Sequence, residues 1–136
     1  MTFIKPYLIR LAHCDPTGMV FLPNYFYILN ALVEDWFYEA LEVRYDEYLM
    51  ERKVSLATVK LETVFSKSTR MGETVDFWLT VSHLGRSSIR FTMGVDKEND
   101  ARVRVQRVAV LVDQLSTRPV DWPPELREKI TEFMRG

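Results

Sequence analysis

The stretch PNYFYILNALVEDWFYEAL, residues 23–41, decides the fold. Pro23 suits the first position of an α-helix, where its missing N–H costs nothing. Most of the side chains that follow are apolar and cover more than a single stripe of the helix; only a narrow ridge through Asn30, Glu34 and Tyr38 is polar. A helix that is apolar on most sides is enclosed by other structure. The sequence therefore predicts a long helix buried in the core.

After residue 53 the spacing of apolar residues changes from the period of a helix to the period of a strand. Every second side chain is apolar in four consecutive segments, which are separated by turn signals. This pattern predicts an antiparallel meander with short connections. In the last segment the apolar face shifts near Gln106 and Arg107, where we expect a bulge. The predicted strands are residues 54–68, 73–83, 87–96 and 102–113.

Three further elements complete the prediction: a first strand over residues 3–11, a short helix over residues 45–52 and an amphipathic helix over residues 123–134. Only the sheet is large enough to cover the apolar helix, so we expect an α+β fold in which a curved antiparallel sheet wraps a long central helix. The outer face of the sheet is partly apolar, which points to a second sheet or subunit packed nearby. The residues concerned are Val64, Trp78, Val108 and Val110.

Length and composition narrow the class of protein. The chain has 136 residues, which predicts a single domain over residues 1–136. Its 18 Lys and Arg side chains stand against 19 Asp and Glu, and the net charge of −1 argues against a nucleic-acid binder. The single cysteine excludes an internal disulfide and a cysteine-cluster zinc site; because no targeting segment appears either, we expect a cytoplasmic protein. Residues 16–33 carry no charge, but their Pro, Gly and Asn residues favour a loop and a buried helix over a membrane span.

The loop before the long helix carries the candidate chemistry. Asp15 opens the turn-forming sequence DPTG, so it can be a turn residue with no further role. Alternatively, it faces the start of the helix, whose unpaired N–H groups could hold a carbonyl oxygen that becomes negative during attack. A carboxylate opposite could attack the carbonyl carbon or take a proton from water. Cys14 is interpreted as a small buried hydrophobe, because its neighbour His13 would point to the opposite face of a strand.

Residues 13–25, HCDPTGMVFLPNY, resemble the signature loop of the 4-hydroxybenzoyl-CoA thioesterase family, and the order of elements after this loop agrees over nearly the whole chain. The resemblance implies the hotdog fold and the hydrolysis of an acyl-CoA thioester to a free acid and coenzyme A. A related branch, linked with the Tol-Pal envelope system, carries a histidine where this chain has Leu22. Its absence favours the type that acts on aromatic acyl groups of the hydroxybenzoyl kind, although the acyl group itself is not identified.

The resemblance also assigns roles to single residues. Asp15 takes the place of the catalytic carboxylate and would act as nucleophile or as general base. The backbone N–H of Leu22 takes the place of the donor that polarises the thioester carbonyl, and Gly18 would let the backbone approach the ligand closely. Phe21 and Tyr25 are candidates for the acyl pocket, with packing in the core as the alternative role for Tyr25.

Coenzyme A carries phosphates and should meet basic groups at the protein surface. The family places its nucleotide contacts at the turn that holds Arg86 and Ser87 in this chain, and a solvated hairpin tip is the alternative. Thr58 is a weaker candidate for lining the pantetheine channel. We interpret Arg102 and Arg104 as part of a solvated sheet face.

The resemblance further implies a homodimer, and beyond it a homotetramer, with the active site between two subunits. We expect acyl-CoA as the only ligand, with no metal, no cofactor, no nucleic acid and no membrane. Glu34 and Asp35, on the helix, are expected at a rim or in salt bridges. Three alternatives stay open: a thioesterase for short or medium aliphatic chains, a hotdog hydratase, and a non-catalytic acyl-CoA-binding dimer in which Asp15 only caps the helix.

Overall fold

A computed structural model describes residues 1–136. The predicted long helix begins at Leu22 as α1 (Leu22–Asp35) and continues directly as a π-helical turn, Trp36–Ala40. A 3₁₀ turn, Leu11–His13, comes before the loop that leads into α1. The remaining elements are β1 (Phe3–Leu8), α2 (Tyr45–Arg52), β2 (Val54–Phe65), β3 (Thr74–Leu84), β4 (Ser88–Lys97), β5 (Asp100–Asp113) and α3 (Pro124–Arg135).

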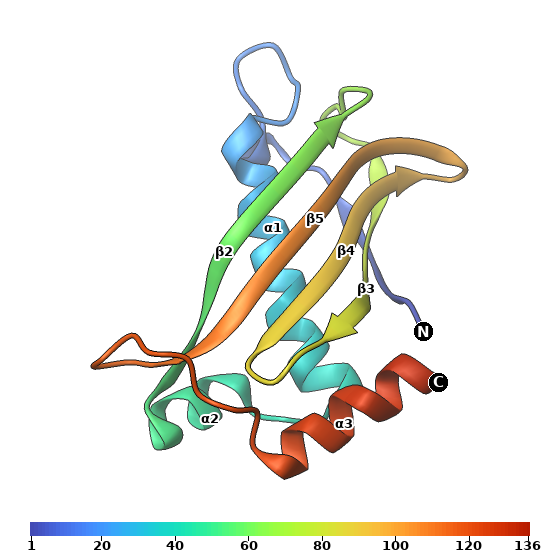
Figure 1. Cartoon of the computed structure of the whole chain (residues 1–136). Helices are drawn as coiled ribbons and strands as arrows, with labels where there is room; N and C mark the ends of the chain where they lie inside the picture. Colours follow the sequence, from blue (N-terminus) through green and yellow to red (C-terminus); the bar gives the residue numbers. More distant parts are fainter.

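The five strands form one antiparallel sheet in the order β1-β3-β4-β5-β2 (Figure 1). Only β3, β4 and β5 form a meander, so the expectation that β2 and β3 are hairpin neighbours is wrong. After β2, residues 66–73 cross the end of the sheet, and β3 begins on the far side of β4 and β5. Alternating side chains set which face of a strand is buried, but they do not encode the strand with which it pairs.

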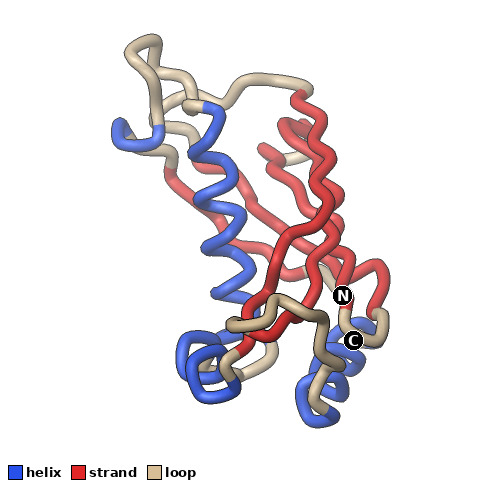
Figure 2. The backbone as a smooth tube through the Cα atoms, turned by 60° about the vertical axis from the view of Figure 1, so that its left-hand side comes forward, coloured by secondary structure: helices blue, strands red, loops and turns tan.

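The curved sheet lies against one side of α1, which confirms the predicted hotdog arrangement (Figure 2). Trp36 lies at the centre of the core and is fully buried. Its ring makes edge-on contacts with Phe91 of β4 and Phe133 of α3, at centroid distances of 5.4 and 5.5 Å. Such aromatic pairs stabilise the core beyond the area they bury. The buried face of α1 itself consists of Tyr25, Ile28, Leu29, Leu32 and Val33.

One side of α1 is left uncovered by the chain. Tyr27 is 72% exposed, and Asn30 and Glu34 are also exposed on the same ridge. Asp35 sits at the rim, as expected, where it pairs with Lys5 of β1. Tyr27 and Leu22, which is 52% exposed, are the large apolar side chains of α1 that the chain leaves uncovered.

The predicted bulge lies on a different strand. Arg107 keeps the alternation of β5 and faces α1, together with Val105 and Ala109, so the expected shift of face near Gln106 and Arg107 does not occur. Instead, Val59 is an extra residue in β2, because Thr58 pairs with Ala109 and Lys60 with Val108. A bulge of this kind turns a side chain to a new direction. The sequence of β5 suggested that the apolar face shifts only because a charged residue, Arg107, occupies a position on the inner face of the strand.

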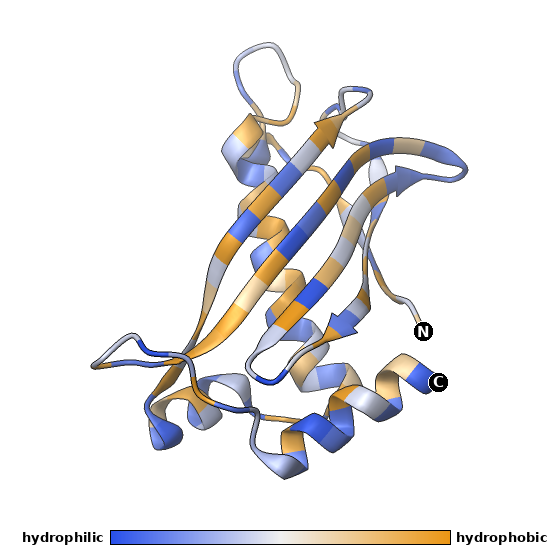
Figure 3. Ribbon diagram, in the orientation of Figure 1, coloured by the Kyte–Doolittle hydropathy of each residue, from blue (hydrophilic) through white to orange (hydrophobic).

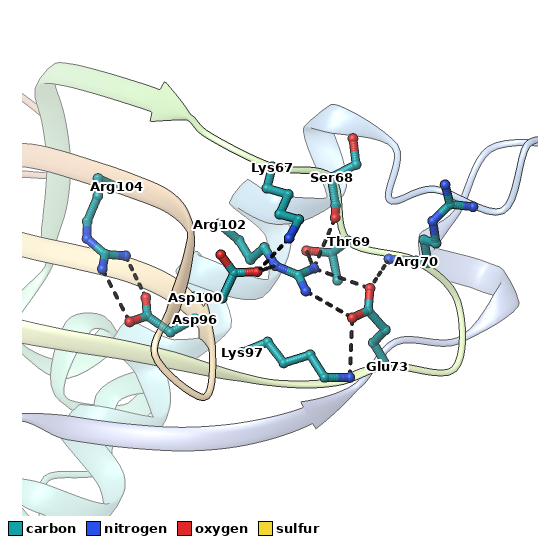
Figure 4. A network of polar contacts seen from close by, with 10 residues as sticks. All are labelled: Lys67, Ser68, Thr69, Arg70, Glu73, Asp96, Lys97, Asp100, Arg102 and Arg104. Carbon is teal, nitrogen blue, oxygen red and sulfur yellow. Dashed lines mark hydrogen bonds and ion pairs between the residues drawn. The ribbon is translucent and has the colours of Figure 1, made fainter.

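Arg102 is not part of a solvated face: it is 5% exposed and lies at the centre of a polar network (Figure 4). A second bulge, at the start of β5, turns it inward, since Val95 pairs with Val103 but Asp96 pairs with Ala101. Its guanidinium donates to both carboxylate oxygens of Glu73, at 3.2 and 3.0 Å. It also donates to the Ser68 carbonyl and to Asp100. The network joins β5 to the segment of residues 66–73 that crosses the end of the sheet.

Arg104 does stand on the outer face of the sheet, but it is only half exposed. Its guanidinium lies 5.2 Å from the centre of the Trp78 ring and pairs with Asp96. The Trp78 ring itself covers Gly94, where an added Cβ would come within 2.5 Å of ring carbon Cζ2. Arg104 therefore covers an aromatic ring with its planar group, which is a packing role rather than simple solvation.

The uncharged stretch of residues 16–33 divides into a loop and the first part of α1, as expected. Among the helices, none combines the length and the apolar character that crossing a bilayer requires. Apolar and polar residues alternate along much of β2 and along the first half of β5, whereas residues 108–112 of β5 are all apolar (Figure 3).

The ion pair between Glu73 and Arg102 should dominate the acid sensitivity of the fold. The hydrogen bonds from Arg102 lower the pKa of Glu73 from 4.5 to about 2. A carboxylate whose pKa is depressed by folding stabilises the protein above its unfolded pKa, and that stabilisation is lost as the pH falls through the folded value. Glu73→Gln should therefore lower the free energy of unfolding by about 3 kcal/mol at neutral pH. The difference from the unmodified protein should shrink between pH 4.5 and about 2.

Denaturant unfolding measured across this pH range tests the prediction. Glu62→Gln is the matched control, because Glu62 forms an exposed pair with Lys60 and should change stability by less than about 1 kcal/mol. Equal losses in the two variants, or a loss for Glu73→Gln that does not depend on pH, would contradict it.

Candidate active site

The loop before α1 is a small antiparallel hairpin. Cys14 bridges to Val20, and the Phe21 N–H donates to the His13 carbonyl at 2.9 Å. The hairpin closes through Gly18, which has a φ of 81° and donates its N–H to the Asp15 carbonyl. Glycine adopts this left-handed conformation without strain. Gly18 therefore lets the loop reverse direction, and its expected close approach to a ligand stays a prediction.

The Asp15 carboxylate lies at the tip of this hairpin and is half exposed. Its Oδ1 accepts hydrogen bonds from the Thr17 N–H at 2.8 Å and from the Thr17 hydroxyl at 2.5 Å. These bonds lower the pKa of Asp15 below its usual value, so the group is ionised at neutral pH. The second oxygen, Oδ2, accepts no hydrogen bond from the chain. Asp15 therefore combines a turn-forming oxygen with a free anionic one.

The N-terminus of α1 presents the second element of the site. Phe21 precedes the helix with an extended backbone and caps it with no side-chain hydrogen bond. The Leu22 N–H has no acceptor within the chain, and Pro23 has no N–H to offer. An unpaired N–H at a helix start carries a partial positive charge and attracts a negative or polarised oxygen.

A cavity of about 240 Å³ opens beside Leu22, where the helix start meets the end of β2. Tyr25 is buried behind it, with its ring 5.9 Å from that of Phe65. Phe21 is 53% exposed on the loop side. The chain thus brings the expected residues Leu22 and Tyr25 to one cavity, while Asp15 does not line it. The other lining residues are Val20, Ser66, Lys67 and Ser68.

The crossing segment holds the loop in place. The Val20 N–H donates to the Thr69 carbonyl and the Met71 N–H donates to the Gly18 carbonyl, both at 2.9 Å. Thr69 is fully buried and lies against the guanidinium of Arg102, which is the centre of the network in Figure 4. The position of the Asp15 loop therefore depends on Arg102, a role that the sequence did not reveal.

A second cavity, of about 160 Å³, lies further along α1, between the helix and β2 and β5. Thr58, the candidate for the pantetheine channel, lines it and accepts a hydrogen bond from Arg107 Nε at 2.8 Å. Arg107 Nη1 donates to the Asn30 side chain at 2.9 Å. Sequence reasoning missed Asn30 and Arg107 as site residues; the signal was a charged residue at an inward position of an apolar strand.

Arg86 and Ser87 lie far from Asp15 within one chain. The Asp15 loop contacts residues that precede β3, whereas Arg86 and Ser87 follow its last residue, Leu84. The 11 residues of β3 separate the two by roughly 35 Å, at about 3.3 Å per residue. In Figure 1 the loop is at the top and the turn between β3 and β4 is at the bottom. A single chain therefore does not bring these candidates to the carboxylate.

Other chemistry has little support in the structure. Desolvation raises the pKa of the Cys14 thiol, and the neighbouring Asp15 charge adds to this effect, so the thiol stays protonated. His13 Nδ1 accepts a hydrogen bond from the Arg10 N–H and serves a turn. No three His, Cys, Asp or Glu side chains are grouped in a way that could hold a metal ion.

Solved structures share this fold at low sequence identity. A Staphylococcus aureus protein in complex with CoA has a TM-score of 0.88 and 14% identity over 99% of this chain and 85% of its own. A 1,4-dihydroxy-2-naphthoyl-CoA thioesterase from Synechocystis has a TM-score of 0.86 and 15% identity over 97% of each chain. A gentisyl-coenzyme A thioesterase has a TM-score of 0.81 and 17% identity over 94% of this chain and 99% of its own.

Among curated proteins, no sequence matches the chain. The family model described as the thioesterase-like superfamily, in contrast, matches residues 9–130. This range includes the Asp15 loop, α1, the sheet from β2 to β5 and the first part of α3. The chain therefore belongs to the thioesterase-like superfamily and is a thioester hydrolase.

Proposed function

We propose that the protein hydrolyses acyl-CoA thioesters at the N-terminus of α1. The observation that carries this proposal is that a free N–H donor, on Leu22, and an ionised carboxylate, on Asp15, lie at the same end of the molecule. The donor stabilises the oxygen that becomes negative when the thioester carbon is attacked. The carboxylate supplies the base or the nucleophile.

The reaction consumes one water molecule. In the general-base form, Asp15 takes a proton from water, the hydroxide adds to the carbonyl carbon, and the tetrahedral oxyanion accepts the Leu22 N–H. The C–S bond then breaks, and the thiolate of coenzyme A receives the proton that Asp15 held. In the nucleophilic form, Asp15 attacks the carbonyl carbon and forms a mixed anhydride as the C–S bond breaks and the thiolate of coenzyme A leaves. Water then hydrolyses the anhydride, which frees the acid, restores the Asp15 carboxylate and supplies the proton that the thiolate takes up. Neither form needs a metal or a cofactor beyond the coenzyme A of the substrate.

The acyl group in this proposal is aromatic, of the hydroxybenzoyl kind. Two structural neighbours are thioesterases for ring-bearing acyl groups, dihydroxynaphthoyl and gentisyl. The 160 Å³ cavity between α1 and the sheet is mostly apolar, and an apolar cavity of about 150 Å³ holds a benzene ring. A neighbour solved with CoA supports coenzyme A as the carrier.

The proposed active unit is a homodimer, in which β2 pairs with its copy. The strand lies at the edge of the sheet and is 12 residues long. Val59 and Val64 are 61% and 62% exposed along it. A long open edge with exposed apolar side chains is suited to pairing with another strand. Such a dimer would cover the two cavities beside β2, and Arg86 and Ser87 would contact coenzyme A held mainly by the partner subunit.

We also propose that two dimers assemble into a tetramer through the outer face of the sheet. The proposed location of the protein is the cytoplasm. Val108 and Val110 keep that face partly apolar, and the only cysteine needs no oxidising compartment. The turn that Thr17 forms on Asp15 favours one rival function, a non-catalytic acyl-CoA-binding dimer. The first experiment below separates the two functions.

Asp15→Asn should lower kcat/KM for thioester hydrolysis by at least about 100-fold, the order expected for the loss of an acid–base group. The amide can still accept the hydrogen bonds of Thr17, so the turn and the fold are retained. Release of free thiol from a panel of aromatic and aliphatic acyl-CoAs, with acyl-CoA binding measured in parallel, gives the result. Glu47→Gln, on α2 and outside both the Asp15 loop and β2, serves as a control for a lost surface charge.

Binding without thiol release by the unmodified protein would establish the rival binding function. A loss below about tenfold in Asp15→Asn would remove Asp15 from the mechanism. Hydration of an enoyl-CoA without thiol release would instead indicate a hydratase.

Thr63→Pro should convert the dimer to a monomer and lower activity with it. Because the Ser66 N–H donates to the Arg102 carbonyl, and N–H groups alternate sides along a strand, the Thr63 N–H points away from β5 to the open edge. Proline at position 63 removes one backbone N–H donor from the open edge and breaks no hydrogen bond within the chain. Glu62→Pro, one position away, should instead break the ladder with β5 and destabilise the fold.

Sedimentation velocity together with thermal unfolding distinguishes these effects. A Thr63→Pro protein that remains a dimer of unchanged stability would exclude pairing through the β2 edge.

A further inference from the structure

The cavity between α1 and the sheet contains a cation that the chain does not neutralise. Arg107 reaches it from the inner face of β5, and its guanidinium donates only to the neutral side chains of Thr58 and Asn30. No carboxylate oxygen lies within 4 Å of it, whereas Arg102 and Arg104 on the same strand both have ion-pair partners. Two of its five N–H groups are used, so three remain free.

The surroundings of Arg107 make this arrangement costly unless a ligand completes it. Five of the eight residues that line the cavity are hydrophobic, and Met93 and Val105, which line its floor, are almost fully buried. Desolvation is the main effect on the Arg107 guanidinium and lowers its pKa, although an arginine remains charged. Arg107 is partly exposed, and a charge that is partly removed from water is stabilised when it is paired with an opposite charge.

The β2 bulge explains why Thr58 lies beside Arg107. Thr58 and Leu61 both line the cavity although they are three positions apart, which in a regular strand would place them on opposite faces. The extra residue, Val59, restores Leu61 to the inner face while Thr58 stays beside Arg107. Thr58 and Asn30 then hold the guanidinium from two sides, which orients its free N–H groups.

The distance between the cavity of Arg107 and the Leu22 N–H suits an acyl group with one ring. Phe65 lines the cavity beside Leu22, and its ring contacts Phe26, which lines the cavity of Arg107. Leu22 and Asn30 are eight residues apart on α1, or about 12 Å at a rise of 1.5 Å per residue. An acyl group with one ring, together with a hydrogen bond of about 2.9 Å at each end, fits a span of this order.

We propose that Arg107 determines the acyl specificity of the enzyme by pairing with an anionic oxygen, a carboxylate or an ionised phenol, on the ring of the acyl group. This inference rests on the thioesterase function proposed above and adds the charge of the substrate. Guanidinium groups recognise carboxylates with paired, charge-assisted hydrogen bonds. Thr58 and Asn30 act as positioning residues for the guanidinium.

Four CoA thioesters that differ only at the para position test the proposal: benzoyl, 4-methoxybenzoyl, 4-hydroxybenzoyl and 4-carboxybenzoyl. The methoxy group provides an oxygen that cannot ionise. For the unmodified protein we expect kcat/KM for the hydroxy or the carboxy substrate to exceed that for benzoyl and methoxybenzoyl by at least about tenfold. The better of the two identifies the anion as a phenolate or a carboxylate.

Three variants assign the preference to Arg107. Arg107→Met should abolish it, so that the kcat/KM values of the four esters become equal within about threefold, because an apolar side chain of similar length fits the cavity but cannot pair with an anion. Arg107→Lys retains the charge but not the planar fork, and should keep a smaller preference for the anionic substrates over methoxybenzoyl. Arg90→Met removes an exposed arginine with no ion-pair partner from the neighbouring strand, and should leave the preference unchanged.

The outcomes separate the two proposals. If none of the four esters is hydrolysed, and aliphatic acyl-CoAs are not hydrolysed either, the thioesterase proposal fails and this inference fails with it. If all four are hydrolysed with equal kcat/KM, or the preference persists in Arg107→Met, only the role of Arg107 is overturned. Should Arg107→Met fail to fold by thermal unfolding, the substrate series and Arg107→Lys still decide the question.

Discussion

The buried ion pair between Arg102 and Glu73 is the constraint on which the arrangement of the site depends. The chain leaves β2 at one edge of the sheet and must reach β3 across the end of β4 and β5. Arg102 holds this crossing segment by donating to Glu73 and to the Ser68 carbonyl. Because a buried guanidinium requires its partners to stay in position, the segment has little freedom. The hairpin loop that carries Asp15 hydrogen-bonds to the same segment, so the loop takes its position from Arg102 as well.

The long helix has a structural and a chemical role that use different parts of it. Its buried face forms the core with the sheet, and its first residue leaves a backbone donor free. Further along, Asn30 orients Arg107 in the cavity. In the proposed function, the first position belongs to the reacting end of the site and the second to its specificity end, and Phe65 of β2 contacts α1 between them.

The exposed ridge of α1 and the open edge of β2 are best understood together. Tyr27 and the valines of β2 are apolar and exposed although the core of the chain is complete. Both surfaces flank the cavities that hold Leu22 and Arg107. A surface of this composition beside an incomplete pocket is typical of a site that a second subunit closes. In the proposed dimer, the free edge of the sheet is therefore part of the active site together with the carboxylate.

Local pattern was enough to predict the long helix, the strands, α3 and the loop with Asp15, because hydrophobic period and turn-forming residues act over a few residues. It also placed the acid, the turn and the helix start next to one another, whereas Leu22 was assigned through the family resemblance, and the roles of Asp15 and Leu22 stay predictions. Pattern failed at Arg102, Arg107 and the order of β2. Whether an arginine is solvated, ion-paired or left facing a cavity depends on partners distant in sequence, such as Glu73 and Asn30.

The amino-acid sequence by itself thus determined the elements, the enclosed helix and the position of the candidate carboxylate at its N-terminus. Only the tertiary structure decided that β2 occupies an edge, that Arg102 anchors the crossing segment and that Arg107 stands unpaired in an apolar cavity. The physical reason is range: periodicity and capping are properties of neighbouring residues, whereas strand pairing and charge compensation are settled by contacts between segments far apart in the chain.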